Sequence, residues 1–236
     1  MLLYGGWGTW LLLALPGLLL GFWAQSKVKR SFKKYAKVPT RRGLTGQQVA
    51  RALLDQNGLH DVAIEETQGQ LSDHYDPRHK VLRLSPDVYR QTSIAAAGIA
   101  AHETGHAIQD KEKYGPLVVR TASVPAVSFS SKLSSIIFSV GFVLLFFTRS
   151  EFAYYIVGLG VIFFTLTVIF SLITLPVEFN ASKRAKAQLV NNFLLDKDEM
   201  VGVNKVLDAA ALTYVAAAIA AIGQLLYYLA ILNRNR

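Results

Sequence analysis

Four long apolar stretches constrain the fold of this chain more than any other feature of its sequence. They are residues 7–24, 133–147, 153–175 and 210–232. Each is long enough, or nearly so, to cross about 30 Å of hydrocarbon as a helix. A chain with 52% apolar and only 17% charged residues suits that interpretation. We therefore expect a mainly α polytopic membrane protein with about four transmembrane helices.

The charges beside the first stretch predict its orientation. No charged side chain precedes it, which argues against a cleaved signal peptide. Eight basic residues follow it with no acidic residue among them, and under the positive-inside rule this flank stays in the cytoplasm. The basic residues are Lys27, Lys29, Arg30, Lys33, Lys34, Lys37, Arg41 and Arg42. The amino terminus is then expected outside, and residues 25 to about 125 inside.

The same rule predicts where the rest of the chain lies. Residues 148–152 form a tight outer loop, and the segment after residue 175 returns to the cytoplasm, where Lys183, Arg184 and Lys186 agree with it. Arg234 and Arg236 would lie outside, but a tail this short has little effect on topology. The last helix is the least certain span, since it is rich in alanine and contains Gln224.

The basic run and the net charge of +9 have two interpretations. In the first, the basic residues bind nucleic acid. In the second, they lie beside anionic lipid and fix the orientation of the first span. The second needs no further partner, so we expect a lipid bilayer and no nucleic acid.

These spans divide the chain into five segments. Residues 1–25 form the first transmembrane helix, 26–127 a cytoplasmic region, 128–175 two further transmembrane helices, 176–209 a cytoplasmic helical segment, and 210–236 the last transmembrane helix and tail. Within the cytoplasmic region, residues 44–57 suit a helix capped by Thr45 and ended by Gly58. Residues 61–66, 68–75 and 80–84 predict a small antiparallel sheet.

The run at residues 100–109 contains a His-Glu-x-x-His motif. His102 and His106 are four residues apart in an alanine-rich segment without proline, so they share one helix face, with Glu103 beside them. Zinc takes imidazole nitrogens in a tetrahedral shell and lowers the pKa of water, whose proton a carboxylate can take and deliver to a leaving amine. The alternative is that two histidines fall four residues apart by chance on a core helix and bind no metal. Gly105 indicates that another backbone packs close by.

A third zinc ligand must come from elsewhere in the chain. Residues 107–116 contain no histidine, so the extended metzincin motif is absent and a distant glutamate becomes the better candidate. Glu178 lies at the end of the third span, on the same predicted membrane face as His106, and Pro176 suits the first turn of a new or kinked helix. Glu178 could equally be an interfacial glutamate paired with Arg184. Glu151 and Glu199 are weaker rivals.

As a set, these residues resemble the membrane-bound neutral zinc metallopeptidases of the YugP type, distantly similar to the HtpX peptidases. The resemblance covers almost the whole chain and rests on residues 71–77, 82–85, 100–109, 178–182 and 212–217. It implies a gluzincin-like peptidase in which His102, His106 and Glu178 hold one Zn²⁺ per chain and Glu103 is the base. It also implies a small cytoplasmic α+β zincin-like catalytic region.

The resemblance directs attention to the residues around the ligands as well. Asn180, Ser182 and Arg184 are expected beside them, although the family commonly has aspartate where Asn180 stands. An amide can still hydrogen-bond but supplies no charge, so the affinity for metal could be lower here.

The segment before the motif helix has a possible catalytic role of its own. An edge strand there could pair with an extended substrate, and His74 or Tyr75 could donate a hydrogen bond to the oxyanion. The alternative is that the Asp76-Pro77 turn merely shapes a hairpin and His74 faces solvent. His60 and His79 are interpreted as surface residues.

The expected function is that of a zinc endopeptidase in the plasma membrane, with several spans and an active site facing the cytoplasm. Its substrates are expected to be unfolded or membrane-proximal polypeptides, and the relatives suggest membrane-protein quality control. The alternative from another class is a non-proteolytic adaptor or scaffold that retains a zinc site. Glu103 argues against it, because a structural zinc site needs no adjacent base. A small transporter ranks last, since the spans contain almost no ionisable groups. The oligomeric state is not predicted.

Overall fold

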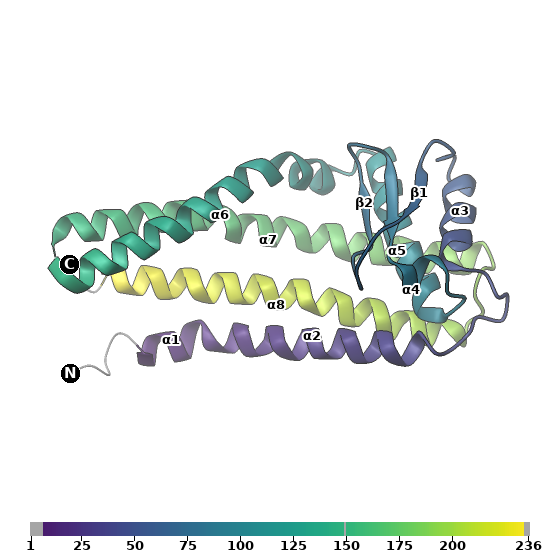
Figure 1. The fold of residues 1–236 in the computed structure, drawn as a ribbon, viewed down its shortest axis with the longest axis horizontal. Coiled ribbons are helices and arrows are strands. Elements are labelled where there is room, and N and C mark those ends of the chain that lie inside the picture. Colours follow the sequence, from purple (N-terminus) through teal and green to yellow (C-terminus); the bar gives the residue numbers. More distant parts are fainter. Residues whose placement is uncertain (1–6, 149, 234–236) are drawn as a thin grey trace. The chain divides into compact units, whose positions relative to one another are not determined.

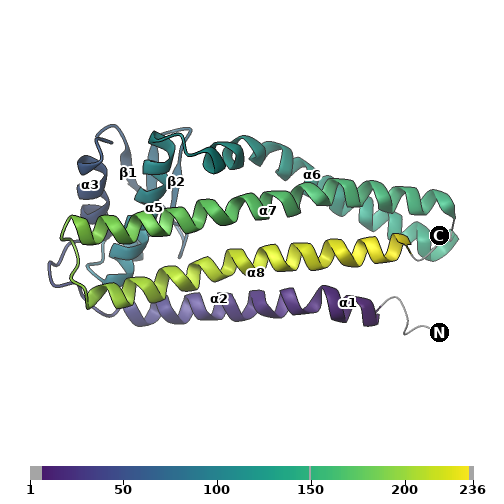
Figure 2. The ribbon, with the colours of Figure 1, turned by 180° about the vertical axis from the view of Figure 1, so that it is seen from behind.

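The structure, a computed structural model, describes residues 7–148 and 150–233. The predicted tail residues Arg234 and Arg236 lie outside these ranges. The described residues are mainly helical, with one small sheet (Figures 1 and 2). They divide into two compact units. A helical unit contains residues up to 23, 119–175 and those from 213 onward, and a mixed unit contains residues 24–118 and 176–212.

Three helices among the described residues are long and apolar enough to cross a membrane. They are α6 (Gly115–Thr148), α7 (Glu151–Asn191) and α8 (Glu199–Asn233). The predicted spans at residues 133–147, 153–175 and 210–232 fall within them. The first predicted span is divided between α1 (Trp7–Leu13) and α2 (Leu15–Tyr35). Pro16 has no N–H to donate to the carbonyl of Leu12, which explains the break. The predicted count of four is therefore not confirmed.

Small residues let the first helices of the helical unit approach α8 closely. A Cβ added to Gly223 would lie 2.0 Å from the carbonyl oxygen of Leu13, and one added to Gly17 would lie 2.5 Å from the Cα of Ala220. Both views show α8 running beside α1 (Figures 1 and 2). In membranes, where lipid is as apolar as the helices, such close backbone contact is a main source of helix association.

The first helix of the mixed unit begins and ends as its sequence predicts. In α3 (Gly46–Gln56) the Thr45 side chain accepts a hydrogen bond from the Gln48 N–H, and the Gln48 side chain accepts one from the Thr45 N–H. This capping box pairs two N–H groups that have no partner within the helix. Gly58 follows with φ of +64°, the left-handed conformation that glycine adopts without strain.

The sheet differs from the antiparallel sheet that the sequence predicts. Its strand order is β1 (Ala63–Glu66), β3 (Val81–Leu84), β2 (His74–Asp76). β2 pairs antiparallel with β3, but β1 pairs parallel with β3, so the purely antiparallel prediction is wrong. Residues 67–73 carry the chain across the sheet instead of forming the first half of a long second strand. As a result β2 is short and lies at the sheet edge.

The motif helix α5 (Ile94–Lys111) lies at the centre of the mixed unit. Ser93 caps it by accepting a hydrogen bond from the Ala96 N–H, and α4 (Pro86–Tyr89) precedes it. Ala97 and Ala101 belong to one apolar cluster with α3 and the carboxyl-terminal part of α7, whereas Ala96 and Ala100 belong to another with the sheet. Burial on both sides fixes the orientation of the helix and therefore of its polar side chains.

Candidate metal centre

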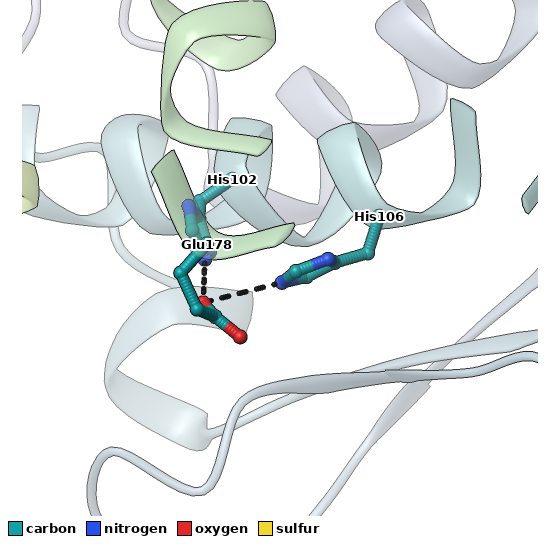
Figure 3. A group of neighbouring side chains, drawn as sticks. All are labelled: His102, His106 and Glu178. Atoms are coloured by element: carbon teal, nitrogen blue, oxygen red, sulfur yellow. Dashed lines mark hydrogen bonds and ion pairs between the residues drawn. The ribbon is translucent and has the colours of Figure 1, made fainter. Parts of the chain in front are cut away.

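His102, His106 and Glu178 come together from two helices of the mixed unit (Figure 3). The histidines lie one turn apart on α5, with ring centroids 4.9 Å apart and nearly perpendicular planes. Glu178 comes from α7, which continues through Pro176 without starting a new helix. Its Oε2 atom lies 3.2 Å from His102 Nε2 and 3.6 Å from His106 Nε2. All three side chains are largely buried.

The donor atoms fit a zinc ion. Ligands about 2.0–2.2 Å from a tetrahedral ion lie about 3.3–3.5 Å from one another, and the two measured nitrogen–oxygen distances lie on either side of that range. Two imidazoles and one carboxylate are also a known donor set for catalytic zinc. Burial alone would raise the pKa of the Glu178 carboxyl, but the two histidines hold it below its ordinary value. Glu178 therefore stays anionic, as a ligand must.

A chain of hydrogen bonds sets the orientation of His106. His106 Nδ1 lies 3.0 Å from Gln109 Oε1. Gln109 Nε2 donates to the carbonyl oxygen of Val177 and to Asn180 Oδ1, both at 2.9 Å. Arg184 Nε donates to the same Asn180 oxygen at 2.6 Å. Asn180 therefore reaches His106 only through Gln109.

His102 is oriented separately, by Ser182. The Ser182 hydroxyl oxygen lies 3.1 Å from His102 Nδ1, so both histidines have a side-chain partner on Nδ1 and keep Nε2 toward Glu178. Partners of this kind on the second ring nitrogen orient metal-bound histidines and raise their basicity. Among the predicted neighbours, Ser182 contacts a ligand directly, and Asn180 and Arg184 act at a distance.

A close helix contact brings Glu178 to the histidines. A Cβ added to Gly105 would lie 2.7 Å from the carbonyl oxygen of Ala181, a distance that real Cβ atoms essentially never show. The sequence prediction that another backbone packs against Gly105 is confirmed. Ala181 is one turn beyond Glu178 on α7, so this contact sets how near the third donor lies to the motif helix.

Glu103 is buried beside the candidate site. Its Oε2 atom accepts a hydrogen bond from the backbone N–H of Tyr75 in the edge strand β2, at 3.1 Å. Burial, helped by the negative charges of Glu178 and Asp73, raises the pKa of Glu103 to about 7 against the opposing effects of His102 and this N–H. A carboxyl group with a pKa near neutrality can both take and return a proton.

The structure brings the backbone of Tyr75, rather than its hydroxyl, to the site. The hydroxyl donates to Asp110 Oδ2 at 2.8 Å, and Lys80 pairs with the same carboxylate. Burial and this carboxylate raise the pKa of the Tyr75 phenol. His74 is exposed, with Nδ1 2.8 Å from the carbonyl oxygen of Ser72. Oxyanion stabilisation by His74 or Tyr75 stays a prediction.

Gln109 is the residue of this site that sequence reasoning missed. It is completely buried and joins His106 to α7. A signal was present, because Gln109 follows His106 by three residues and therefore lies on the same helix face. Buried amides need hydrogen-bond partners, so an amide at this position indicates a polar contact with the site.

Comparisons with known proteins agree with this geometry. A family model described as "Putative neutral zinc metallopeptidase" matches residues 10–233. The "Putative membrane protease YugP" of Bacillus subtilis (strain 168) is 48% identical over 224 residues, which cover 95% of this chain and 96% of that protein. No solved structure matches the chain significantly.

Proposed function

This chain belongs to the family described as "Putative neutral zinc metallopeptidase", and from that premise we propose that it is a membrane-embedded, zinc-dependent endopeptidase. The observation that carries the proposal is the convergence of His102, His106 and Glu178, with the buried carboxyl of Glu103 next to them on the motif helix. A structural zinc site has no use for such a base.

The residues of the chain have distinct roles in the proposed reaction. Zn²⁺, when bound, lowers the pKa of water and polarises the scissile carbonyl. The imidazoles of His102 and His106 and the carboxylate of Glu178 would hold the ion, and Gln109 and Ser182 orient the two imidazoles. Glu103 takes the proton of the attacking water and returns it to the leaving amine. The N–H of Tyr75 holds the Glu103 carboxylate in position for both transfers.

The edge strand offers a place for the substrate backbone. β2 pairs with β3 along one side only, and it lies in the same unit as the site. An extended polypeptide adding to its free edge would be bound through main-chain groups other than the Tyr75 N–H, and such hydrogen bonds are independent of sequence. This mode suits unfolded or membrane-proximal polypeptides as substrates, and a role in membrane-protein quality control.

The proposed topology has four spans, in the plasma membrane, with the site in the cytoplasm. Residues 7–24 supply the fourth span despite the break at Ala14, because small residues pack them against α8. The eight basic residues that follow favour the cytoplasm on the positive-inside rule. Residues 24–118 and 176–212, which form the mixed unit, then lie on the same side of the membrane.

Cleavage of an unfolded protein tests the proposal. The purified, detergent-solubilised protein is expected to cut casein when loaded with zinc, and Glu103→Gln at equal zinc content is expected to lose at least about 100-fold in rate, as for loss of a general base. If neither protein cuts casein or an unfolded membrane-protein fragment while both bind zinc, the proposal fails and a zinc-holding adaptor becomes the better account.

A further inference from the structure

One pocket of the mixed unit is lined by cationic side chains. It has a volume of about 720 Å³, within the range of ligand sites. Lys29, Lys33 and Lys37 line it from one side, each four residues after the last, so that α2 and its continuation present them in a row. Asp87 lines it too and offsets one of the three charges. Within the part of the chain that the structure describes, none of the three lysines pairs with a carboxylate.

The loop that leads into the edge strand also lines this lysine pocket. Gln70 and Leu71 come from the segment between β1 and β2. Leu71 is exposed and has φ of +54°, a conformation that leucine rarely adopts. The loop is held by the Ser72 hydroxyl, which donates to the carbonyl of Gln68 at 2.9 Å, and by Asp73, whose carboxylate accepts from the Ser85 N–H at 2.7 Å. The exposed leucine is thus fixed beside the lysines.

The lysine pocket is close to Glu103, the proposed general base beside the candidate metal centre. Leu71 is four residues before Tyr75, whose N–H contacts the Glu103 carboxylate. Four extended residues span at most about 14 Å. A polypeptide that pairs with β2 and continues toward Leu71 would therefore bring a side chain about four residues from the bond that is cut to the lysines.

The chemistry of the lining favours one occupant. Three lysines complement carboxylates, Phe32 and Leu71 supply apolar contact, and the amides of Gln70 and Gln91 can hydrogen-bond a peptide backbone. An anionic lipid headgroup fits less well. On the proposed topology α2 leaves the membrane, and its lysine row is about 12 Å long, whereas the headgroup layer is only about 5–8 Å thick.

We infer that the lysine pocket is a substrate subsite for acidic side chains about four residues from the scissile bond. This inference rests on the proposed function and narrows its substrate class to polypeptides with aspartate or glutamate near the cleavage point.

Matched peptides test the inference. A peptide derived from a site cut in casein is made with glutamate three to five residues from the scissile bond, on either side, and again with glutamine there. At 0.15 M salt the parent protein is expected to show kcat/KM about 10-fold higher for the acidic peptide, as two or three exposed charge pairs would give. Equal values for the two peptides would overturn the inference.

Two triple variants separate the lysine pocket from the general charge of the region. In Lys29→Gln/Lys33→Gln/Lys37→Gln, the ratio of kcat/KM for the acidic peptide to kcat/KM for the glutamine peptide is expected to fall close to one. Arg30→Gln/Lys34→Gln/Arg42→Gln removes the same charge from the same region, outside the pocket lining, and is expected to keep the preference. If both triple variants lost the preference for the acidic peptide equally, the preference would come from the general positive charge of the region and not from a subsite. Replacing the three pocket lysines by glutamate is expected to shift the preference to a lysine-containing peptide, which a misfolded variant would not do.

Binding keeps this test independent of activity. Zinc-loaded Glu103→Gln is titrated with the labelled acidic and amide peptides, with and without the pocket triple. Tighter binding of the acidic peptide that requires the three lysines supports the subsite even if the parent cuts nothing, in which case only the proposed function fails. If the pocket triple leaves peptide binding unchanged and instead weakens binding to vesicles containing phosphatidylglycerol, the lysine pocket is a lipid site and the inference is wrong.

Discussion

The tautomer of His106 follows from hydrogen bonds whose direction is fixed. The Val177 carbonyl can only accept and the Arg184 guanidinium can only donate, so Gln109 must turn its NH₂ group toward α7 and its oxygen toward His106. His106 therefore holds a proton on Nδ1, which leaves Nε2 as the nitrogen that would bind a metal after losing its own proton. The protonation of one candidate zinc ligand is thus set by residues outside the candidate ligand set.

Loss of the Gln109 amide should weaken metal binding. Gln109→Met keeps the volume of the side chain but leaves His106 Nδ1 without its acceptor, and we expect the Kd for zinc to rise by about 10–100-fold. Competition with a chromogenic chelator measures this. Gln56→Met, an exposed residue of α3, is the matched control and should leave the Kd unchanged. Equal affinities in all three proteins would contradict the orienting role of Gln109.

Asn180 is the position at which the family commonly has aspartate. Its oxygen already accepts from Gln109 and Arg184, so Asn180→Asp would keep both bonds and make them charge-assisted. We expect zinc to bind more tightly, but by less than about 10-fold, because the added charge reaches His106 only through Gln109. Asn180→Leu should instead weaken binding. Weaker binding in Asn180→Asp would show that the amide itself is required.

Asp76 should make the mixed unit sensitive to acid. Its hydrogen bond with His79, helped by Arg83 and two backbone N–H groups, outweighs the opposing effect of burial and lowers the pKa of the Asp76 carboxyl well below its ordinary value of 3.8. Because the folded-state pKa is the lower one, the stabilisation is complete above the ordinary pKa, declines as pH falls below that value, and is lost as pH falls through the folded-state pKa. The melting temperature of the parent should exceed that of Asp76→Asn at pH 6, and the difference should become smaller as pH falls toward 3. A constant difference would contradict this.

At the level of elements, the contact of Gly105 with α7 should tolerate no side chain. Alanine favours a helix over glycine by about 1 kcal/mol, yet a Cβ at Gly105 would meet the Ala181 carbonyl at 2.7 Å. We expect Gly105→Ala to lower both the melting temperature and the zinc content, since overpacking costs about 1–3 kcal/mol. Gly98→Ala in the same helix is the control, because the nearest atom to its Cβ would be a Val203 methyl carbon at 3.3 Å and not a backbone carbonyl. If the two variants had the same melting temperature and zinc content, the close contact between Gly105 and α7 would not be what positions the site.

Elements defined by local signals could be predicted from the sequence. The helix at α3 follows from Thr45 and Gly58, both within a few residues of its ends. The motif helix follows from alanine content and the spacing of its histidines. The sheet could not be predicted in the same way, because the parallel pairing of Ala63 with Val81 joins residues far apart in the chain. Nothing in the short, separated strands distinguishes that pairing from a hairpin.

The candidate site was predictable to a similar extent. His102, Glu103 and His106 follow from spacing, and Glu178 was reached only through topology and resemblance, since its contacts with them are made by folding. The hydrogen bond from the Tyr75 N–H to Glu103 could not be predicted, because every residue except proline has a backbone N–H and the sequence does not show which one meets Glu103.

For the whole molecule, the absence of cysteine makes the proposed topology directly testable. Single substitutions Arg42→Cys and Ser150→Cys, labelled in intact cells with a membrane-impermeant maleimide, should react only after lysis and before lysis, respectively. An amino-terminal tag accessible from outside would show that residues 7–24 cross the membrane as the fourth span. Labelling of Arg42→Cys in intact cells would reverse the proposed orientation, whatever the peptidase activity.

The separation of the ligands along the chain has a consequence for biosynthesis. Glu178 lies 76 residues after His102, and most of the intervening chain belongs to the helical unit. At about 5–20 residues per second, a ribosome needs about 4–15 s to pass from one to the other. During that interval the nascent chain carries the base and both imidazoles but not the third ligand. On the proposed topology, two helices must also be threaded through the bilayer before the set is complete. On the proposed function, the three candidate zinc ligands are therefore present together only after both helices have been synthesised.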